Sequence, residues 1–255
     1  MEDAVLESKT TELRSRQTGL LSAVEDGNPK SEKVLVFLAG FPDNEISAWG
    51  EVLETIRLSP QASTDYRILC LCLPDFEDSA VPKPWGWSIT EIAEMLDNTI
   101  NHYITSPSAQ IYFVLHDWGS IFGLDYQNKY PLRVAKMVLF DVGMGMSKGQ
   151  QPCPKFILVF YQWWWAFAYI LSQLFCTCWG KCCFVSFSYL VSSCCQPTPA
   201  DMAHHSRNAR SVKIHMCYIY YQFWKDFFFT REKRLLYEFP TCPVLYMVIN
   251  INKFS

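Results

Sequence analysis

The residue whose type and position carry the clearest chemical meaning is an aspartate at a junction between an apolar segment and a helical one. Asp117 stands in the sequence LHDWG, where His116 separates it from the apolar run 110–115. A side chain at such a junction projects from the end of a sheet, and the following backbone N–H groups lie at a helix N-terminus, where they stabilise negative charge. A serine there would indicate acyl transfer. A carboxylate favours attack on a saturated carbon, which forms an ester that water later cleaves. Helix capping is the alternative role for this aspartate.

The elements that must position Asp117 follow an alternating pattern. Short apolar runs predict five buried strands, and segments with helical spacing lie between the first four of them. The helix after Ser88 is the best signalled, because Glu91 completes a capping box. Strands that are apolar on both faces and alternate with helices indicate a parallel sheet covered on both sides, whose ligand site lies outside the carboxyl ends of the strands. The predicted strands are 34–38, 67–73, 110–115, 136–140 and 244–249, and the predicted helices are 48–56, 88–100 and 123–130.

Composition excludes several classes of protein. Half of the 255 residues are hydrophobic and 18% are charged, the reverse of a disordered chain. With 22 basic and 25 acidic residues, the chain lacks the basic face that a nucleic-acid partner requires. The charged N-terminal sequence MEDAVLESK has no apolar core of a signal peptide, so we expect a cytoplasmic protein with mostly reduced thiols.

Cysteines are the main candidates for metal ligands. Six of the eleven fall between Cys176 and Cys195, without the C-x-x-C spacing typical of zinc sites. Small buried side chains and exposed thiols are the expected interpretation, with metal binding together with His204 and His205 as the alternative. We therefore predict neither a metal site nor a cofactor.

Residues 156–180 contain no charged side chain and are long enough to cross a bilayer. Three tryptophans, Trp163 to Trp165, lie in the middle of this run rather than at its ends, where interfacial tryptophans belong. The favoured interpretation is an apolar helical element that covers a pocket. Membrane or lipid contact through 156–180 is the alternative.

Taken together, these motifs resemble the α/β-hydrolase superfamily, specifically its epoxide hydrolase and haloalkane dehalogenase branch. HDWG after a strand resembles the nucleophile elbow of that branch, and AGFP at 39–42 resembles its H-G-x-P oxyanion turn. LPDF at 73–76 and KYPLRV at 129–134 extend the resemblance. It implies a mostly parallel sheet with helices on both faces and an inserted helical lid. The implied parts are a lead-in (1–33), the hydrolase core (34–144), the lid (145–238), and a penultimate core strand with a truncated tail (239–255).

The resemblance also implies the roles of residues around the elbow. Asp117 would attack the substrate carbon, and the backbone of Phe41 and Trp118, beside Gly40 and His116, would form the oxyanion and substrate-binding site. Dehalogenases of this branch commonly have Asn after the glycine of the turn, so Phe41 indicates the epoxide hydrolase version. The implied substrate is a small apolar organic molecule, an epoxide or an alkyl halide.

Epoxide opening needs an acid that protonates the leaving oxygen, a role taken by lid tyrosines in the resembled family. Tyr220 and Tyr221 match the family's second tyrosine position. Tyr161 and Tyr169 are candidates for the first. Aromatic packing is the alternative role for each of these side chains.

Two groups of residues depart from the family pattern. The family's general base is a histidine after the last strand, whereas the histidines of this chain are at 102, 116, 204, 205 and 215, all before Phe239. Asp141, after a strand, matches an earlier position of the family's orienting acid. In addition, Ala39 replaces the histidine of the oxyanion turn, and Leu115 replaces a small residue, which predicts strain at the elbow.

Two functional hypotheses follow. The first is an epoxide hydrolase-like protein that lacks the hydrolytic histidine, because the chain stops one strand early, and is therefore inactive or limited to one turnover. The second is a noncatalytic hydrolase-fold protein that binds lipid, membrane or a partner chain through its apolar lid. An unpaired sheet edge also predicts poor stability.

Overall fold

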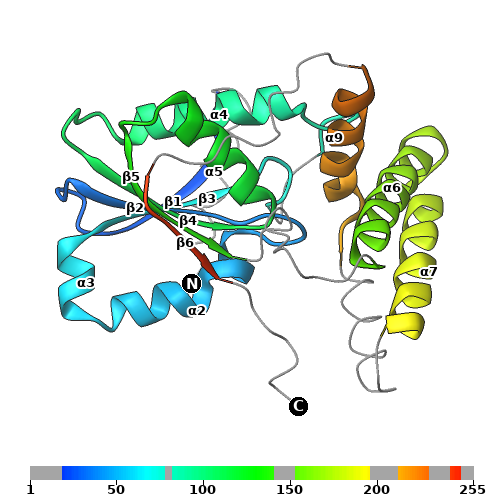
Figure 1. Ribbon diagram of the computed structural model, residues 1–255, viewed down its shortest axis with the longest axis horizontal. Helices are drawn as coiled ribbons and strands as arrows, with labels where there is room; N and C mark the ends of the chain where they lie inside the picture. Colours follow the sequence, from blue (N-terminus) through cyan, green and yellow to red (C-terminus); the bar gives the residue numbers. More distant parts are fainter. Residues whose placement is uncertain (1–18, 78–81, 141–152, 196–211, 230–241, 248–255) are drawn as a thin grey trace, which may run out of the picture. The chain divides into compact units, whose positions relative to one another are not determined.

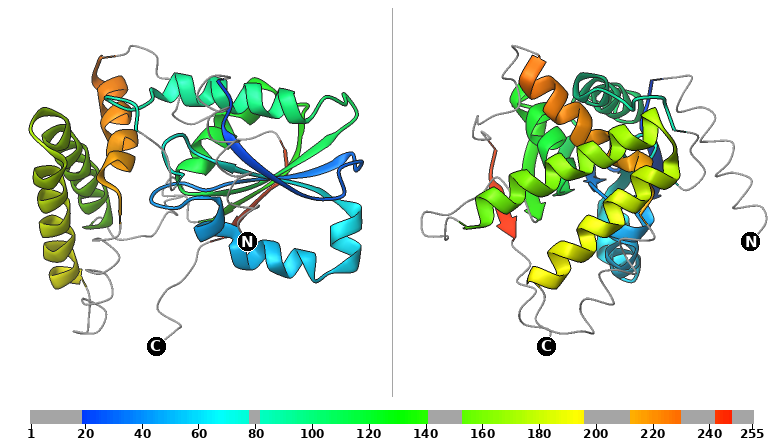
Figure 2. Two further views of the ribbon diagram at one scale, coloured as in Figure 1. Left: turned by 180° about the vertical axis from the view of Figure 1, so that it is seen from behind. Right: turned by 90° about the vertical axis from the view of Figure 1, so that its right-hand side faces the viewer.

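The computed structural model divides into two compact units, shown as ribbons in Figure 1 and Figure 2. The core unit comprises Met1–Ala80, Thr90–Met146 and Arg234–Ser255, and the helical unit comprises Val81–Ile89 and Ser147–Lys233. The structure defines the fold within each unit separately. The residues that the structure describes are 19–77, 82–140, 153–195, 212–229 and 242–247.

The core unit is built on a six-stranded sheet in the order β1-β3-β2-β4-β5-β6. Strand β1 is antiparallel to β3, and every other neighbouring pair is parallel. Figure 1 shows α4 and α5 on one side of the sheet and α2 and α3 on the other. The predicted α/β fold with a mostly parallel sheet is confirmed. The elements are β1 (Ser22–Gly27), β2 (Lys33–Leu38), α2 (Glu45–Arg57), α3 (Pro60–Asp65), β3 (Arg67–Cys72), α4 (Ile89–Tyr103), β4 (Gln110–His116), α5 (Trp118–Lys129), β5 (Val134–Phe140) and β6 (Val244–Met247).

The lead-in predicted over 1–33 contains the strand β1, which the sequence pattern did not indicate. An edge strand needs only one hydrogen-bonded neighbour and keeps a solvent-facing side, so it carries no continuous apolar signal. Its charged residues lie at the surface, where Glu25 Oε2 accepts a hydrogen bond from Arg67 Nη2 at 2.7 Å. The ladder to β3, rather than an apolar face, holds β1 in place.

The last predicted strand was expected to be buried, and this expectation is wrong for its described part. Strand β6 pairs only with β5, and in the described residues it forms the edge of the sheet. The Leu245 side chain is 57% exposed. An apolar run of four to six residues therefore indicated a strand but not its position in the sheet.

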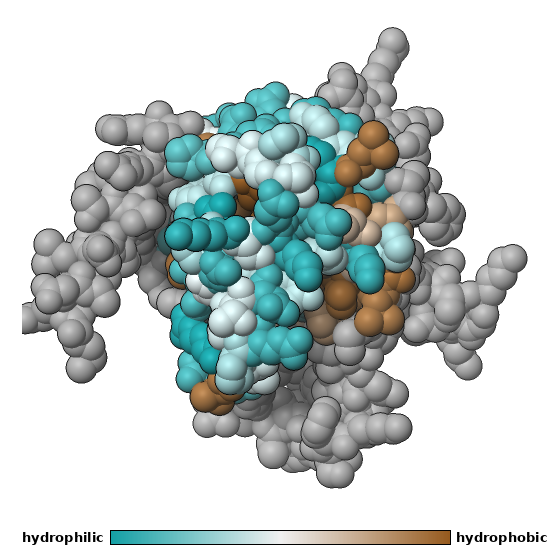
Figure 3. Space-filling view, turned by 90° about the vertical axis from the view of Figure 1, so that its left-hand side faces the viewer, coloured by the Kyte–Doolittle hydropathy of each residue, from teal (hydrophilic) through white to brown (hydrophobic). Residues whose placement is uncertain are grey.

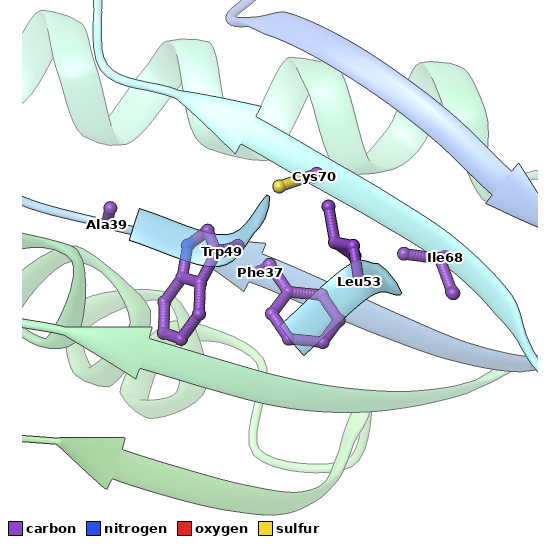
Figure 4. Packing of buried hydrophobic residues seen from close by; sticks show 6 residues of the cluster. All are labelled: Phe37, Ala39, Trp49, Leu53, Ile68 and Cys70. Atoms are coloured by element: carbon purple, nitrogen blue, oxygen red, sulfur yellow. The ribbon is translucent and has the colours of Figure 1, made fainter. Parts of the chain in front are cut away.

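The core beneath α2 explains why alanine occupies position 39. Ala39 is buried in an apolar cluster shown in Figure 4, where the Phe37 and Trp49 rings meet edge to face at 5.3 Å. An imidazole at position 39 would place polar nitrogens next to this cluster, at a desolvation cost. The cluster comprises Phe37, Ala39, Trp49, Leu53, Ile68 and Cys70. By contrast, the face of the core unit seen in Figure 3 carries mostly hydrophilic side chains.

The helical unit contains α6 (Cys153–Leu174), α7 (Thr177–Cys195), the short 3-10 helix η1 (Ile214–Cys217) and α9 (Tyr218–Phe229). Three consecutive tryptophans of α6 point in different directions around the helix. The Trp163 ring meets Trp224 of α9 at 5.5 Å, and the Trp164 ring stacks on Phe187 of α7 at 4.9 Å. The Trp165 ring lies 5.4 Å from Phe184 of α7 and 5.0 Å from Tyr220 of α9. The tryptophans therefore sit mid-run because they join three helices.

The uncharged run 156–180 is divided between two helices. Helix α6 ends at Leu174, and α7 begins at Thr177. Among the described residues, none of the helices combines the length and apolar character needed to span a membrane. The long run therefore covers most of α6, the turn after it and the first residues of α7.

A buried tyrosine leads to a stability prediction. The Tyr126 side chain on α5 is 3% exposed, and its hydroxyl has no hydrogen-bond partner among the described residues. Burial raises the pKa of Tyr126 above its ordinary value of 10.0. The unfolded chain thus loses this proton first, so the free energy of unfolding should fall as the pH rises above about 10.

Tyr126→Phe is expected to raise the free energy of unfolding by about 1 kcal/mol at neutral pH, because it removes an unsatisfied buried hydroxyl. It should also reduce the loss of stability at alkaline pH. Urea unfolding of both proteins at neutral and alkaline pH checks both points. Equal alkaline losses would show that other groups control this pH dependence.

Candidate active site

The candidate site is built around the junction between β4 and α5. Strand β4 ends at His116 and α5 begins at Trp118, so Asp117 alone makes the turn. Its backbone has φ 51° and ψ −124°, a region that costs a non-glycine residue about 1–3 kcal/mol. The Asp117 carboxylate makes no capping hydrogen bond to α5. The helix-capping role considered for this residue is therefore not the one that the structure describes.

The Asp117 carboxylate is instead held by the oxyanion turn that follows β2. Phe41 N donates a hydrogen bond to Asp117 Oδ2 at 2.8 Å, across 76 residues of sequence. Gly40 allows this approach, because a Cβ at position 40 would lie 2.5 Å from Asp117 Oδ2 and closer still to Trp118 N. The turn closes with a hydrogen bond from Asp43 N to Gly40 O at 2.8 Å. The structure thus brings together four predicted site residues: Asp117, Gly40, Phe41 and Trp118.

Leu115 was expected to strain the elbow, and the structure shows how its bulk is accommodated. The side chain is fully buried and points toward Gly123 on α5. A Cβ at position 123 would lie 3.0 Å from Leu115 Cδ2 and closer to Cδ1. A large residue on the strand is therefore compensated by a missing side chain on the helix.

This compensation predicts non-additive stability changes. Leu115→Ala alone is expected to cost about 2–5 kcal/mol, and Gly123→Ala alone about 1–3 kcal/mol by overpacking. The double variant should cost at least about 1 kcal/mol less than the sum, because the new methyl fills part of the cavity. Chemical denaturation of the four proteins gives the coupling. Strictly additive costs would contradict the contact.

The other predicted core-unit positions are placed less directly. The His116 ring lies edge-on to Trp49 at 6.4 Å, so this side chain takes part in aromatic packing beside α2. Asp141 lies outside the described residues, as do His204 and His205. Of the remaining histidines, His102 is exposed on α4. No role as a base is assigned to it by the local structure.

The four candidate tyrosines all belong to the helical unit and form two pairs. The Tyr220 ring lies 6.3 Å from Tyr161, and the Tyr221 ring lies 5.7 Å from Tyr169. Tyr220 and Tyr169 are buried. In each pair one tyrosine belongs to α6 and the other to α9. Each candidate for the family's first tyrosine position, Tyr161 or Tyr169, therefore lies beside a candidate for the second, Tyr220 or Tyr221.

Two features, one in each unit, were not predicted from the sequence. Phe76, after β3, meets the Phe41 ring edge to face at 6.4 Å and supports the oxyanion turn. The segment 82–89 belongs with the helical unit, where Trp85 O accepts a hydrogen bond from Gln222 Nε2 at 2.6 Å. The LPDF sequence after a strand could have indicated the role of Phe76. The local sequence of 82–89 contains no signal that groups this segment with the helical unit.

Metal ligation was the alternative role for the cysteine-rich segment. Across the described parts of the chain, no group of three or more His, Cys, Asp or Glu side chains is arranged to hold a metal ion. Cys176, Cys178 and Cys182 are exposed thiols around the start of α7.

Comparison with known proteins places this geometry in a family. The sequence model of the alpha/beta hydrolase fold family matches residues 33–252, which include the oxyanion turn and the elbow. The chain belongs to this family. The strand-to-helix junction after β4, where Asp117 lies, falls within the matched residues.

Individual relatives are distant. The cis-3-alkyl-4-alkyloxetan-2-one decarboxylase of Shewanella oneidensis is 27% identical over 116 residues, which cover 41% of this chain and 36% of that protein. The chain thus matches well under two thirds of the length of this curated relative. The unliganded epoxide hydrolase CorEH is 16% identical with a TM-score of 0.54, over 89% of this chain and 77% of that one.

A second solved structure is also similar in fold at low sequence identity. The epoxide hydrolase of Bacillus megaterium in complex with an inhibitor is 19% identical with a TM-score of 0.52, over 89% of this chain and 78% of that one. At these identities the similarity concerns the fold, and the chemistry must be argued from the residues of the site.

Proposed function

We propose that this alpha/beta hydrolase opens epoxides, or displaces halide from alkyl halides, with Asp117 as the nucleophile. The observation that carries the proposal is the hydrogen bond from Phe41 N to Asp117 Oδ2 at 2.8 Å. This bond fixes the position of the carboxylate through Oδ2, and Oδ1 is the oxygen that we propose as the attacking atom. The small apolar organic substrates proposed here have electrophilic saturated carbons, which a carboxylate attacks to form an ester.

The proposed first step forms a bond between Asp117 Oδ1 and an epoxide carbon, while the bond from that carbon to the ring oxygen breaks. Oδ2 then becomes the carbonyl oxygen of the ester. Because Oδ2 already accepts the Phe41 N–H, the ester carbonyl forms inside the oxyanion site without rearrangement. Trp118 N, at the start of α5 and close to Gly40, is the second proposed donor.

The opening oxygen needs a proton, and the tyrosines of the helical unit are the proposed source. Tyr161 with Tyr220, and Tyr169 with Tyr221, supply two phenols on facing helices. In this proposal the helical unit acts as the lid. A pair of phenols lets one donate the proton while the other stabilises the oxygen by a hydrogen bond.

Hydrolysis of the ester needs a base that activates water, and the 255-residue chain has no histidine after position 215. We therefore propose that this chain forms the ester and releases it slowly or not at all. Asp141, the proposed orienting acid, has no histidine to orient among the residues that follow β5 in the core unit.

The experiment is incubation of the folded chain with a reactive aromatic epoxide, followed by intact-mass and peptide mass spectrometry. The expected result is one adduct per chain, on Asp117, with less than one equivalent of diol released. An unmodified Asp117 in a demonstrably folded protein contradicts the nucleophile. Diol formation over many equivalents contradicts the missing base.

The second candidate function is noncatalytic lipid or membrane binding through the helical unit. It is favoured by exposed aromatic side chains on α6 and α9, among them Phe160, Trp163 and Phe228. Flotation of the chain with lipid vesicles tests this candidate. The adduct experiment tests the first independently.

A further inference from the structure

The turn between α6 and α7 exposes a row of apolar and thiol side chains with one threonine among them. The Phe175 and Trp179 side chains are 66% and 63% exposed, and their rings stack on each other at 5.6 Å. The hairpin formed by α6 and α7 is visible in Figure 1 and in both views of Figure 2. The exposed residues of this turn, named the hairpin tip below, are Leu174, Phe175, Cys176, Thr177, Cys178 and Trp179.

Backbone hydrogen bonds hold the hairpin tip in this conformation. Phe175 N donates to Leu171 O at 3.1 Å, and Trp179 N donates to Cys176 O at 3.1 Å. Gly180 lets the two helices approach, because a Cβ there would lie 2.5 Å from Ser172 Cβ. The aromatic rings are therefore presented to solvent by a turn that is already formed, which lowers the entropy cost of burying them against a partner.

The charge of the hairpin selects among partners. From residue 153 to residue 195 the sequence has Lys155 and Lys181 and neither Asp nor Glu. Lys181 is exposed, one turn into α7 beside the tip. Aromatic rings flanked by a lysine suit the interface of a membrane that carries anionic headgroups, which attract each nearby lysine by about 1 kcal/mol.

The exposed end of α9 is a weaker candidate for the same role. Phe227 and Phe228 are exposed there, but Asp226 precedes them, and anionic lipids repel a carboxylate. The hairpin tip combines exposed aromatic rings with a lysine on a pair of helices that contains neither Asp nor Glu, whereas at the end of α9 Lys225 is followed directly by Asp226. It is the better match for a negatively charged apolar surface.

We propose that the hairpin tip docks the protein on anionic membranes, with Phe175 and Trp179 inserted among the headgroups and Lys181 paired with their charge. The proposal deepens the lipid-binding function by naming its surface and its lipid class. It does not depend on the chemistry of Asp117.

The test is flotation of the full chain with vesicles of phosphatidylcholine alone and of phosphatidylcholine mixed with phosphatidylserine. The wild type should bind the mixed vesicles more tightly. Phe175→Ser combined with Trp179→Ser should weaken that binding about 100-fold, because two aromatic side chains no longer leave water. Lys181→Gln should weaken it about fivefold.

The matched control is Leu58→Ser combined with Leu132→Ser, which removes two exposed leucines from the core unit and should leave binding unchanged. Brief maleimide labelling adds a readout without substitutions. Vesicles should protect Cys176, Cys178 and Cys182, and leave the labelling of Cys242 in the core unit unaltered.

Each other outcome overturns the proposal in a distinct way. Binding that survives the Phe175 and Trp179 substitutions rejects the tip but keeps lipid binding. Absence of wild-type binding rejects both. Self-association without vesicles that the same substitutions abolish, with no flotation, identifies a second copy of the chain as the partner of the tip.

Discussion

Asp117→Asn is expected to abolish the covalent adduct with an aromatic epoxide while the protein stays folded. The amide oxygen can still accept the hydrogen bond from Phe41 N, and asparagine tolerates the positive φ of 51° better than most residues. Only the nucleophilic carboxylate oxygen is lost. Intact mass after epoxide treatment, with circular dichroism of the untreated variant, measures both expectations.

A matched variant separates the elbow from carboxylates in general. Asp26→Asn removes a carboxylate at the sheet edge that pairs with Arg57 at 2.5 Å. In this variant the adduct should form on Asp117 with the same yield as in the wild type. An adduct of wild-type yield on Asp117→Asn would place the alkylated residue elsewhere. The peptide that carries the mass increase would then identify it.

Gly40→Ala is expected to slow adduct formation about 100-fold, although residue 40 does not react. The added Cβ would meet Asp117 Oδ2 at 2.5 Å and crowd Trp118 N, so the oxyanion turn and the elbow must move apart. Displacement of a reacting group by about 1 Å costs a factor of this size. The same crowding should lower the free energy of unfolding by about 1–3 kcal/mol.

Gly19→Ala is the control for this substitution. Gly19 is likewise a glycine, but a Cβ there would meet nothing within 4 Å. Unlike Gly40, it has a positive φ of 66°. It should lower stability by about 1 kcal/mol through backbone strain and leave the adduct rate unchanged. If Gly40→Ala reacts as fast as Gly19→Ala in folded protein, the contact between turn and elbow does not position the nucleophile.

The sequence by itself determined the type of fold and the elbow. Buried parallel strands must be apolar on both faces, and this strong local signal located β2 to β5 and the junction at Asp117. The oxyanion turn was recognisable only by its resemblance to the H-G-x-P turn of the family, whereas the reason for Gly40, the close approach of Asp117 and Trp118, lies in the tertiary structure. The edge strand β1 escaped this pattern because its ladder to β3 holds it in place, whereas the apolar run of β6 indicated a strand but not its place at the edge of the described sheet.

Only the tertiary structure decided how distant residues act on one another. The hydrogen bond from Phe41 to Asp117 joins segments 76 residues apart, and the bulk of Leu115 is tolerated because Gly123 faces it from α5. The pairing of Tyr161 with Tyr220, and the division of the run 156–180 into two helices, also depend on packing between helices. Local sequence sets the shape of each segment, whereas contacts across the fold depend on side chains whose partners are far away in the chain.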